Sequence, residues 1–273
     1  MKSLLTRTIT GLVYGLLLVG SVILHPLAFL VVYIIITLLT LYEFYSLARG
    51  AGIYLQIIAG IFTGAAIFLI TFLHNYYGIS SGWYLLIPIF IIIILISELF
   101  RKKENPFISL SVLFMGLIYI VLPLTLINLL LFSSYSTSYS FELLIFLFMV
   151  LWVYDTGAYL TGSIIGRKKL YERLSPKKTW EGLIGGMALA LIANAAFGGF
   201  FDQIPVMDRW LLAIVIIISG TFGDLFESMW KRSLGIKDSG KSLPGHGGWL
   251  DRLDSILFAV PSVYLTVEIL KLL

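Results

Sequence analysis

The chain has 273 residues, of which 59% are hydrophobic and 12% are charged, and its mean hydropathy is +0.98. A soluble core cannot bury so much apolar surface, so the lipid bilayer must solvate most of this protein. The chain has no cysteine, which excludes disulfides, thiolate catalysis and cysteine-ligated zinc. The net charge is only +4, so the positions of the charges are more informative than their sum.

Apolar segments follow one another along the whole chain, and each is close to the ~20 residues that a helix needs to cross ~30 Å of hydrocarbon. They cover Thr8–Leu24, Leu27–Tyr42, Tyr54–Leu73, Trp83–Leu99, Ile108–Leu131, Phe141–Leu160, Trp180–Phe200, Trp210–Leu225 and Leu253–Leu270. The pattern predicts an all-α, polytopic integral membrane protein with about nine transmembrane helices.

The distribution of basic residues predicts the orientation. With the N-terminus inside, all but two of the 19 Lys and Arg residues fall in inside segments; the two exceptions are Arg209 and Lys271. This asymmetry follows the positive-inside rule and predicts an outside C-terminus. We therefore expect an integral protein of the cytoplasmic membrane of the cell, with its longer polar loops in the cytoplasm.

The two halves of the chain differ in their loops. Residues 1–140 have short loops and few charges within the spans, whereas the inside loops of residues 141–273 are long and rich in Gly, Lys and Asp. We interpret the first half as scaffold helices and the second as the catalytic region with two cytoplasmic motif loops. No internal repeat is evident, which argues against a transporter, since many transporters are built from repeats.

Carboxylates gather at the inside ends of the last four spans. They are Asp155, Glu181, Asp224, Glu227, Asp251 and Asp254, and the topology alone places them at one membrane depth. An ionised Asp in the bilayer centre costs about 2.5–3.5 kcal/mol, so a protein keeps such groups when they pair with something. Asp155 is compatible with a functional role or with a structural one as a buried partner of a Tyr or Lys.

The spacing of two pairs sharpens this interpretation. Asp224 and Glu227 are three residues apart and share a helix face. Asp251 and Asp254 have the same spacing at a helix start, where the helix dipole favours negative charge. Asp251 is therefore also a candidate helix cap, and Asp254 is a candidate partner of Arg252 or Lys231.

Oxygen ligands in a chain without cysteine favour Mg²⁺ over zinc. Asp224 and Asp251 are the preferred ligands, Asp254 is the third, and a second cation nearby is left open. Phosphate groups would complete the coordination, because Mg²⁺ in proteins usually keeps several waters or substrate phosphates.

The loop before the span at Trp180 is a candidate phosphate cradle. It combines a helix start with two hydroxyls and two cations, namely Ser175, Lys177, Lys178 and Thr179. Basic inside loops are also common as topogenic signals or anionic-lipid contacts, and that alternative stays open.

The segment Ser228–Asp254 reads SMWKRSLGIKDSGKSLPGHGGWLDRLD and is the most polar part of the chain. Glycines around His246, including Gly247 and Gly248, would let the backbone approach a ligand closely. His246 is a candidate contact to a phosphate or a leaving group, or a loop residue bonded to backbone.

Both loops together resemble the phosphatidate cytidylyltransferase family, also called CDP-diacylglycerol synthase. The resemblance rests on SPKKTWEG at Ser175–Gly182, on DTGAY at Asp155–Tyr159, and on the spacing of Ser228, Lys231, Arg232, Lys237, Asp238, Gly240, His246, Gly247, Gly248, Asp251, Arg252 and Asp254. The chain departs at Trp230 and Trp249, where smaller apolar residues are usual. These motifs cover a third of the chain.

The resemblance implies transfer of CMP from CTP to phosphatidic acid, giving CDP-diacylglycerol and pyrophosphate. The lipid phosphate would attack the α-phosphorus of CTP in line, with Mg²⁺ on Asp224 and Asp251 bridging the CTP phosphates. Substrate phosphates would be shared among Lys177, Lys178, Lys231, Arg232, Lys237 and Arg252. Ser175 and Thr179 would supply hydroxyls, Asp238 would orient a lysine or the metal shell, and His246 would protonate or steady pyrophosphate.

Three other functions are compatible with parts of the sequence. A CTP-dependent enzyme acting on another lipid acceptor would use the same motif, which reads the nucleotide better than the lipid. An ion transporter would need polar groups in the outer half of the bilayer, and the last four spans have few there. A non-enzymatic lipid-binding scaffold would leave the Gly-rich loop without a purpose. We expect CTP, phosphatidic acid and the bilayer as partners and no nucleic acid. A homodimer is left open.

Overall fold

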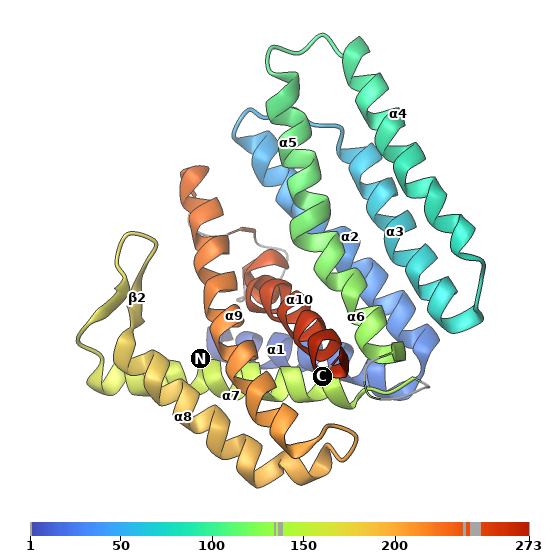
Figure 1. Cartoon of the computed structure of the whole chain (residues 1–273). Coiled ribbons are helices and arrows are strands. Elements are labelled where there is room, and N and C mark those ends of the chain that lie inside the picture. The colour runs from blue at the N-terminus through green and yellow to red at the C-terminus, as the bar shows by residue number, and fades with distance from the viewer. Residues whose placement is uncertain (1, 134, 136–138, 237–238, 241–246, 273) are drawn as a thin grey trace. The chain divides into compact units, whose positions relative to one another are not determined.

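The computed structural model describes residues 2–133, 135, 139–236, 239–240 and 247–272, with side chains from Ile9 onward. The described chain is almost entirely α-helical (Figure 1). It divides into two compact units. One unit contains Met1–Asn128 and Leu234–Leu253, and the other contains Leu129–Ser233 and Asp254–Leu273.

The first unit is built around helix α2 (Pro26–Gly50), which packs against α1 (Lys2–Leu24), α3 (Ile57–Tyr77) and α5 (Pro106–Gly116). A 3-10 turn, η1 (Ser81–Leu85), leads into α4 (Leu86–Phe100). A π-helical turn, η2 (Leu117–Val121), joins α5 to α6 (Leu122–Ser133), whose last turn belongs to the second unit. Aromatic side chains such as Phe29, Phe44 and Tyr45 fill the core of this unit.

The second unit contains α7 (Glu142–Ile165), α8 (Trp180–Phe197), the 3-10 turn η3 (Gly198–Phe200), α9 (Val206–Ser233) and most of α10 (Leu250–Leu272). Helices α7 and α8 pack closely through small residues. A Cβ on Gly186 would lie 2.7 Å from the carbonyl oxygen of Tyr154, and one on Gly157 would lie 3.0 Å from the Cα of Gly186. Gly157 and Gly186 therefore serve packing within one chain.

The prediction of an all-α polytopic membrane protein is confirmed. Eight helices within the described residues are long and apolar enough to cross a membrane, and Ile9–Leu24 is a shorter apolar helix. Many of their large apolar side chains are exposed, as expected of lipid-facing surfaces; Leu16 is 70% exposed and Ile118 is 64% exposed.

Two local features differ from the predicted elements. The loop before Trp180 contains an antiparallel hairpin of β1 (Lys169–Tyr171) and β2 (Ser175–Thr179), with Lys169 opposite Thr179 and Tyr171 opposite Ser175. Helix α9 continues about two turns beyond the predicted end at Leu225, so Asp224 and Glu227 lie on a continuous helical face.

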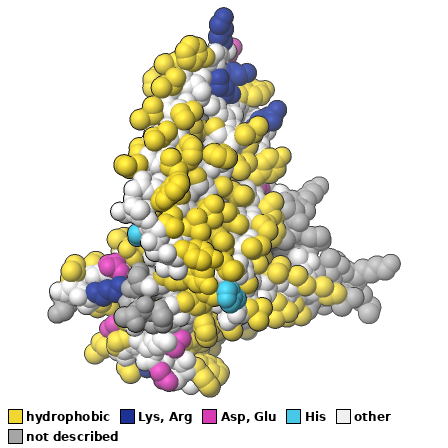
Figure 2. Space-filling view, turned by 90° about the vertical axis from the view of Figure 1, so that its right-hand side faces the viewer, with side chains coloured by type: hydrophobic (Ala, Val, Ile, Leu, Met, Phe, Trp, Pro, Cys, Tyr) yellow, Lys and Arg dark blue, Asp and Glu magenta, His cyan; other side chains and the backbone are white. Residues whose placement is uncertain are grey.

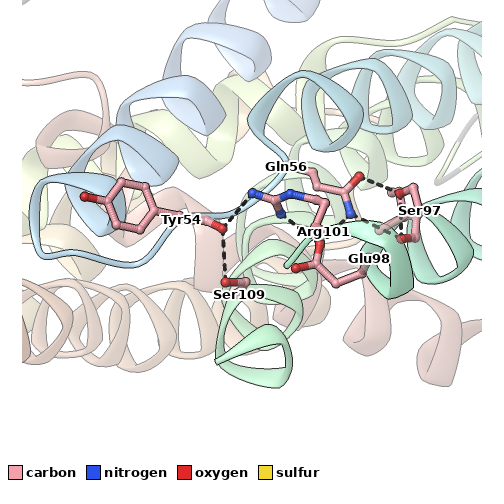
Figure 3. Close-up of polar contacts among 7 residues, drawn as sticks. Tyr54, Gln56, Ser97, Glu98, Arg101 and Ser109 are labelled. Atoms are coloured by element: carbon pink, nitrogen blue, oxygen red, sulfur yellow. Dashed lines mark hydrogen bonds and ion pairs between the residues drawn. The ribbon is translucent and has the colours of Figure 1, made fainter. Parts of the chain in front are cut away.

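A polar cluster joins α3, α4 and α5 at one end of the first unit (Figure 3). Glu98 is 4% exposed, and its Oε2 accepts hydrogen bonds from Gln56 Nε2 (2.5 Å) and Arg101 Nη1 (2.8 Å). The backbone oxygen of Tyr54 accepts further bonds from Arg101 Nη2 and Ser109 Oγ. These bonds explain how a carboxylate is kept in this apolar helix.

Basic residues surround this cluster. Arg49, Arg101 and Lys103 line an adjacent cavity of about 740 Å³, and Lys and Arg side chains gather at one end of a broad hydrophobic face (Figure 2). Such a basic rim at the end of apolar helices is typical of a membrane interface.

Candidate active site

Three carboxylates of the second unit come together between α9 and α10. Oxygen atoms of Asp224, Glu227 and Asp254 all lie within 4.8 Å of one another. The sequence predicts Asp224 and Asp254 as metal ligands, and it places Glu227 among the same carboxylates without predicting it as a ligand. Mutual repulsion makes such a group costly without a counter-charge, and hard divalent cations such as Mg²⁺ bind carboxylate oxygens.

A glycine allows this approach. A Cβ on Gly223 would overlap the carbonyl oxygen of Asp254 and would lie 3.1 Å from the Cα of Ser255. Because only glycine lets the backbones of α9 and α10 approach so closely, Gly223 brings the neighbouring Asp224 toward Asp254. The Gly-Thr-Phe-Gly run before Asp224 thus has a packing role. Thr221 adds a 2.6 Å hydrogen bond to the hydroxyl of Tyr154 in α7.

Two lysines neutralise part of the cluster. Lys178, on β2, forms an ion pair with Asp224. Lys231 forms a 2.5 Å ion pair with the buried Glu227, one helical turn away. The pKa of Lys178 is raised, since burial lowers it but the Asp224 carboxylate more than offsets that effect. Lys178 therefore carries a positive charge at neutral pH.

A cavity of about 230 Å³ lies beside this cluster in the second unit. Its walls bring together residues from α7, β2, α8 and α9, including Asp155, Lys177, Lys178, Thr179 and Asp224. Two basic side chains and two of the predicted carboxylates, Asp155 and Asp224, therefore line one cavity. Cations beside carboxylates suit a ligand that carries both phosphate and a bound divalent cation.

The hairpin positions the phosphate-cradle residues. Thr179 is the N-cap of α8, and its hydroxyl accepts the Gly182 N–H at 3.1 Å. Ser175 opens β2, and Lys177 is exposed. The hydroxyl of Thr179 thus has a helix-capping role. Phosphate binding by Ser175, Lys177 and Thr179 stays a prediction.

Asp251 and the glycines Gly240, Gly247 and Gly248 of the motif segment lie in the first unit. The carboxylate of Asp251 accepts hydrogen bonds from the backbone N–H groups of Gly248 (2.9 Å) and Ser239 (3.2 Å). These donors precede α10, so Asp251 holds the segment before this helix. Its roles as a helix cap and as a metal ligand both stay predictions. Gly247 has φ +84°, a conformation that favours glycine.

Sequence reasoning missed Glu43 of α2, which contacts this motif segment. Its carboxylate accepts hydrogen bonds from Ser239, Trp249 and Leu250. A lone carboxylate directly after the apolar span Leu27–Tyr42 was the available signal.

For several predicted site residues, the structure shows little about the proposed role. Lys237, Asp238 and His246 lie outside the described residues, so their proposed roles stay predictions. Arg232 and Arg252 have exposed side chains, which is compatible with phosphate binding.

Comparison with known proteins identifies the family. The model of the cytidylyltransferase family matches residues 5–270. The chain belongs to the cytidylyltransferase family. The resemblance that the motif loops indicate is thereby confirmed, and it extends over the first half, where the sequence showed only apolar spans.

Individual members of the cytidylyltransferase family are similar over different lengths. The chain is 31% identical over 266 residues to the phosphatidate cytidylyltransferase of Bacillus subtilis (strain 168). This alignment covers 94% of this chain and 95% of that protein. It is 48% identical over 121 residues to the enzyme of that name from Staphylococcus aureus (strain COL), and 44% identical over 124 residues to that of Haemophilus influenzae. The last two alignments cover less than half of each chain.

Proposed function

We propose that this protein transfers CMP from CTP to phosphatidic acid, giving CDP-diacylglycerol and pyrophosphate. The observation that carries the proposal is the cavity lined by Lys177, Lys178 and Asp224, because Asp224 also belongs to the cluster of three carboxylates. The name of the Bacillus subtilis relative, similar over 94% of this chain, supports the same reaction.

The donor set of the acidic cluster fits a divalent cation. Asp224, Glu227 and Asp254 offer only carboxylate oxygens, which are the ligands that Mg²⁺ prefers. Asp251 is proposed as a further ligand on the strength of the sequence motif. When bound, Mg²⁺ would polarise phosphate oxygens and offset the negative charge of the CTP phosphates. A second cation remains part of the proposal.

The transfer needs no protein nucleophile. An oxygen of the phosphatidate phosphate attacks the α-phosphorus of CTP, and the bond between that phosphorus and the oxygen bridging to the β-phosphate breaks. Pyrophosphate leaves with the bonding electron pair. Because both substrates are anionic, the protein contributes mainly positioning and positive charge.

Basic side chains of the protein would bind and position the substrate phosphates. Lys178 neutralises Asp224 in the structure, and Lys177 lies on the same wall of the cavity. We propose that both bind substrate phosphates, with Lys231, Arg232, Lys237 and Arg252 completing the positive surface. His246 would steady or protonate the departing pyrophosphate, and Asp238 would orient a lysine.

The location of the site would serve both substrates. Apolar spans would hold the acyl chains of phosphatidic acid in the bilayer, while polar loops at the helix ends would meet soluble CTP. We propose that the protein resides in the cytoplasmic membrane with these loops inside, as its basic residues indicate.

Isotope placement tests the reaction and the acceptor together. Purified protein is incubated with CTP labelled at either the α- or the γ-phosphorus and with phosphatidic acid, diacylglycerol or an isoprenoid alcohol. The proposal predicts lipid-bound label only from α-labelled CTP and only with phosphatidic acid. Label transferred equally well to another acceptor would replace phosphatidic acid as the substrate.

A further inference from the structure

Glu43 occupies an unusual place for a carboxylate. It lies in α2, a helix long and apolar enough to span a membrane, and it is only 7% exposed. Moving a charged side chain to the bilayer centre costs about 2.5–3.5 kcal/mol, and the cost is smaller near a helix end. A carboxylate kept in such a place needs strong hydrogen-bond donors.

These donors come from the motif segment, 196 to 207 residues further along the chain. Oε1 of Glu43 accepts hydrogen bonds from Ser239 Oγ (2.5 Å) and the Leu250 N–H (3.1 Å), and Oε2 accepts one from the Trp249 N–H (3.0 Å). Leu250 is the first residue of α10 and Trp249 directly precedes it. The first N–H groups of a helix lack partners within the helix. The negative carboxylate also suits the positive end of the helix dipole.

The same segment fixes Asp251. Ser239 links the two carboxylates, because its hydroxyl donates to Glu43 and its N–H donates to Asp251. Gly248 forms the second link, since its N–H donates to Asp251 while its Cα faces Glu43. A Cβ on Gly248 would overlap Glu43 Oε1 and Ser239 Oγ, so only glycine fits there.

We propose that Glu43 is a positioning residue of the active site. It holds Ser239, Trp249 and Leu250 against α2 and thereby fixes the backbone donors that orient the Asp251 carboxylate. The role of Asp251 in holding the metal rests on the proposed function, but the anchoring itself does not. The first half of the chain thus contributes a polar group to the motif loop in addition to its scaffold helices.

Two variants of different severity test whether Glu43 holds Ser239, Trp249 and Leu250 in place. Glu43→Gln replaces one acceptor oxygen by an NH₂ group, which cannot accept a hydrogen bond. If the NH₂ group takes the place of Oε2, it faces the Trp249 N–H; if it takes the place of Oε1, it faces the Ser239 hydroxyl and the Leu250 N–H. Ser239→Ala removes only the hydroxyl and keeps the N–H that donates to Asp251. Glu98→Gln is the matched control, because Glu98 is also a buried carboxylate of the first unit but bonds Gln56 and Arg101.

The first measurement is amide hydrogen exchange of the metal-free protein in detergent. We expect Glu43→Gln to accelerate exchange of the Trp249 and Leu250 amides by about tenfold or more, with a smaller effect of Ser239→Ala. Glu98→Gln should leave these amides protected. Unchanged protection in Glu43→Gln, or equal loss in Glu98→Gln, would overturn the anchor whatever the reaction of the protein.

The second measurement is the Mg²⁺ concentration for half-maximal turnover. Loss of groups that orient metal ligands typically costs 10–100-fold in metal affinity or activity, so we expect Glu43→Gln to raise this concentration by about tenfold. The KM for phosphatidic acid should change little. The double variant with Ser239→Ala should be no worse than Glu43→Gln alone, because both act through one link. A wild-type Mg²⁺ requirement together with lost amide protection would make Glu43 a helix cap only and overturn its role in the site.

Discussion

Lys178 of the β2 strand and Asp224 of helix α9 form an ion pair at the wall of the second unit's cavity. The ammonium group supplies one positive charge to a cluster of three carboxylates. A divalent cation would compete for the same Asp224 oxygens, and a phosphate would attract the same ammonium group. The pair therefore links the proposed metal site to the proposed phosphate site.

Removing the charge of Lys178 is expected to impair catalysis strongly. Lys178→Met leaves the acidic cluster less compensated and deprives the cavity of a cation, and we expect kcat/KM for CTP to fall about 100-fold. Steady-state kinetics on purified protein measures this. Lys177→Met is the control for general loss of basic charge in the same strand, and its effect should be clearly smaller. Equal effects of both variants would mean that the ion pair has no special role.

The ionisation of Lys178 gives a prediction about pH. Its folded pKa is raised above the ordinary value of 10.5, so the folded state holds this proton more tightly than the unfolded state. Its stabilisation is therefore fully present below about pH 10 and is lost as the pH rises through the folded pKa. We expect the difference in thermal stability between wild type and Lys178→Met to be constant from pH 7 to 9. A difference that disappears within this range would contradict the assigned charge.

The acidic cluster is expected to be essential for turnover. Asp224→Asn and Asp254→Asn keep the side-chain shape but remove a charge from the proposed metal site. We expect kcat to fall by at least about 10²–10³-fold, as for the loss of one group of a preorganised electrostatic site. Folding is checked by detergent extraction and gel filtration. Glu268→Gln, which breaks the ion pair with Lys271 near the other end of α10, should remain active. Near-normal turnover of Asp224→Asn would remove that residue from the metal site.

Much of this arrangement could be predicted from the sequence. Apolar runs of span length specify the helices, because the bilayer forces backbone groups to bond within each helix. The i,i+3 spacing of Asp224 and Glu227 specifies a shared face once the segment is helical. The approach of Asp254 to this pair depends on the contact at Gly223, which no local pattern contains.

The contacts of Glu43 could not be predicted from the sequence. Its partners Ser239, Trp249 and Leu250 are 196 to 207 residues away, and no periodicity connects such distant segments. The glycines near His246 were interpreted as places where a ligand approaches the backbone. At Gly248 the approaching groups are the Glu43 carboxylate and the Ser239 hydroxyl of the protein itself. Similarly, the Thr179 hydroxyl, expected to contact phosphate, caps α8.

The contact between α9 and α10 is expected to tolerate no side chain at position 223. A methyl group there would overlap the Asp254 carbonyl oxygen, so the helices must separate. We expect Gly223→Ala to destabilise the protein by about 1–3 kcal/mol, as overpacking does, and to lower turnover by spreading the acidic cluster. Thermal unfolding and CTP turnover measure the two effects. Gly199→Ala, at a position with open space around it, is the control and should behave like wild type.

The central claim is most directly tested by CTP-dependent synthesis of CDP-lipid by the purified protein in detergent with phosphatidic acid, with and without Mg²⁺. The account predicts CDP-diacylglycerol and pyrophosphate in equal amounts, only when Mg²⁺ is present, and none from Asp224→Asn. Equal product formation after complete removal of divalent cations would contradict the metal site. The absence of any product, alongside an active control enzyme, would contradict the proposed reaction.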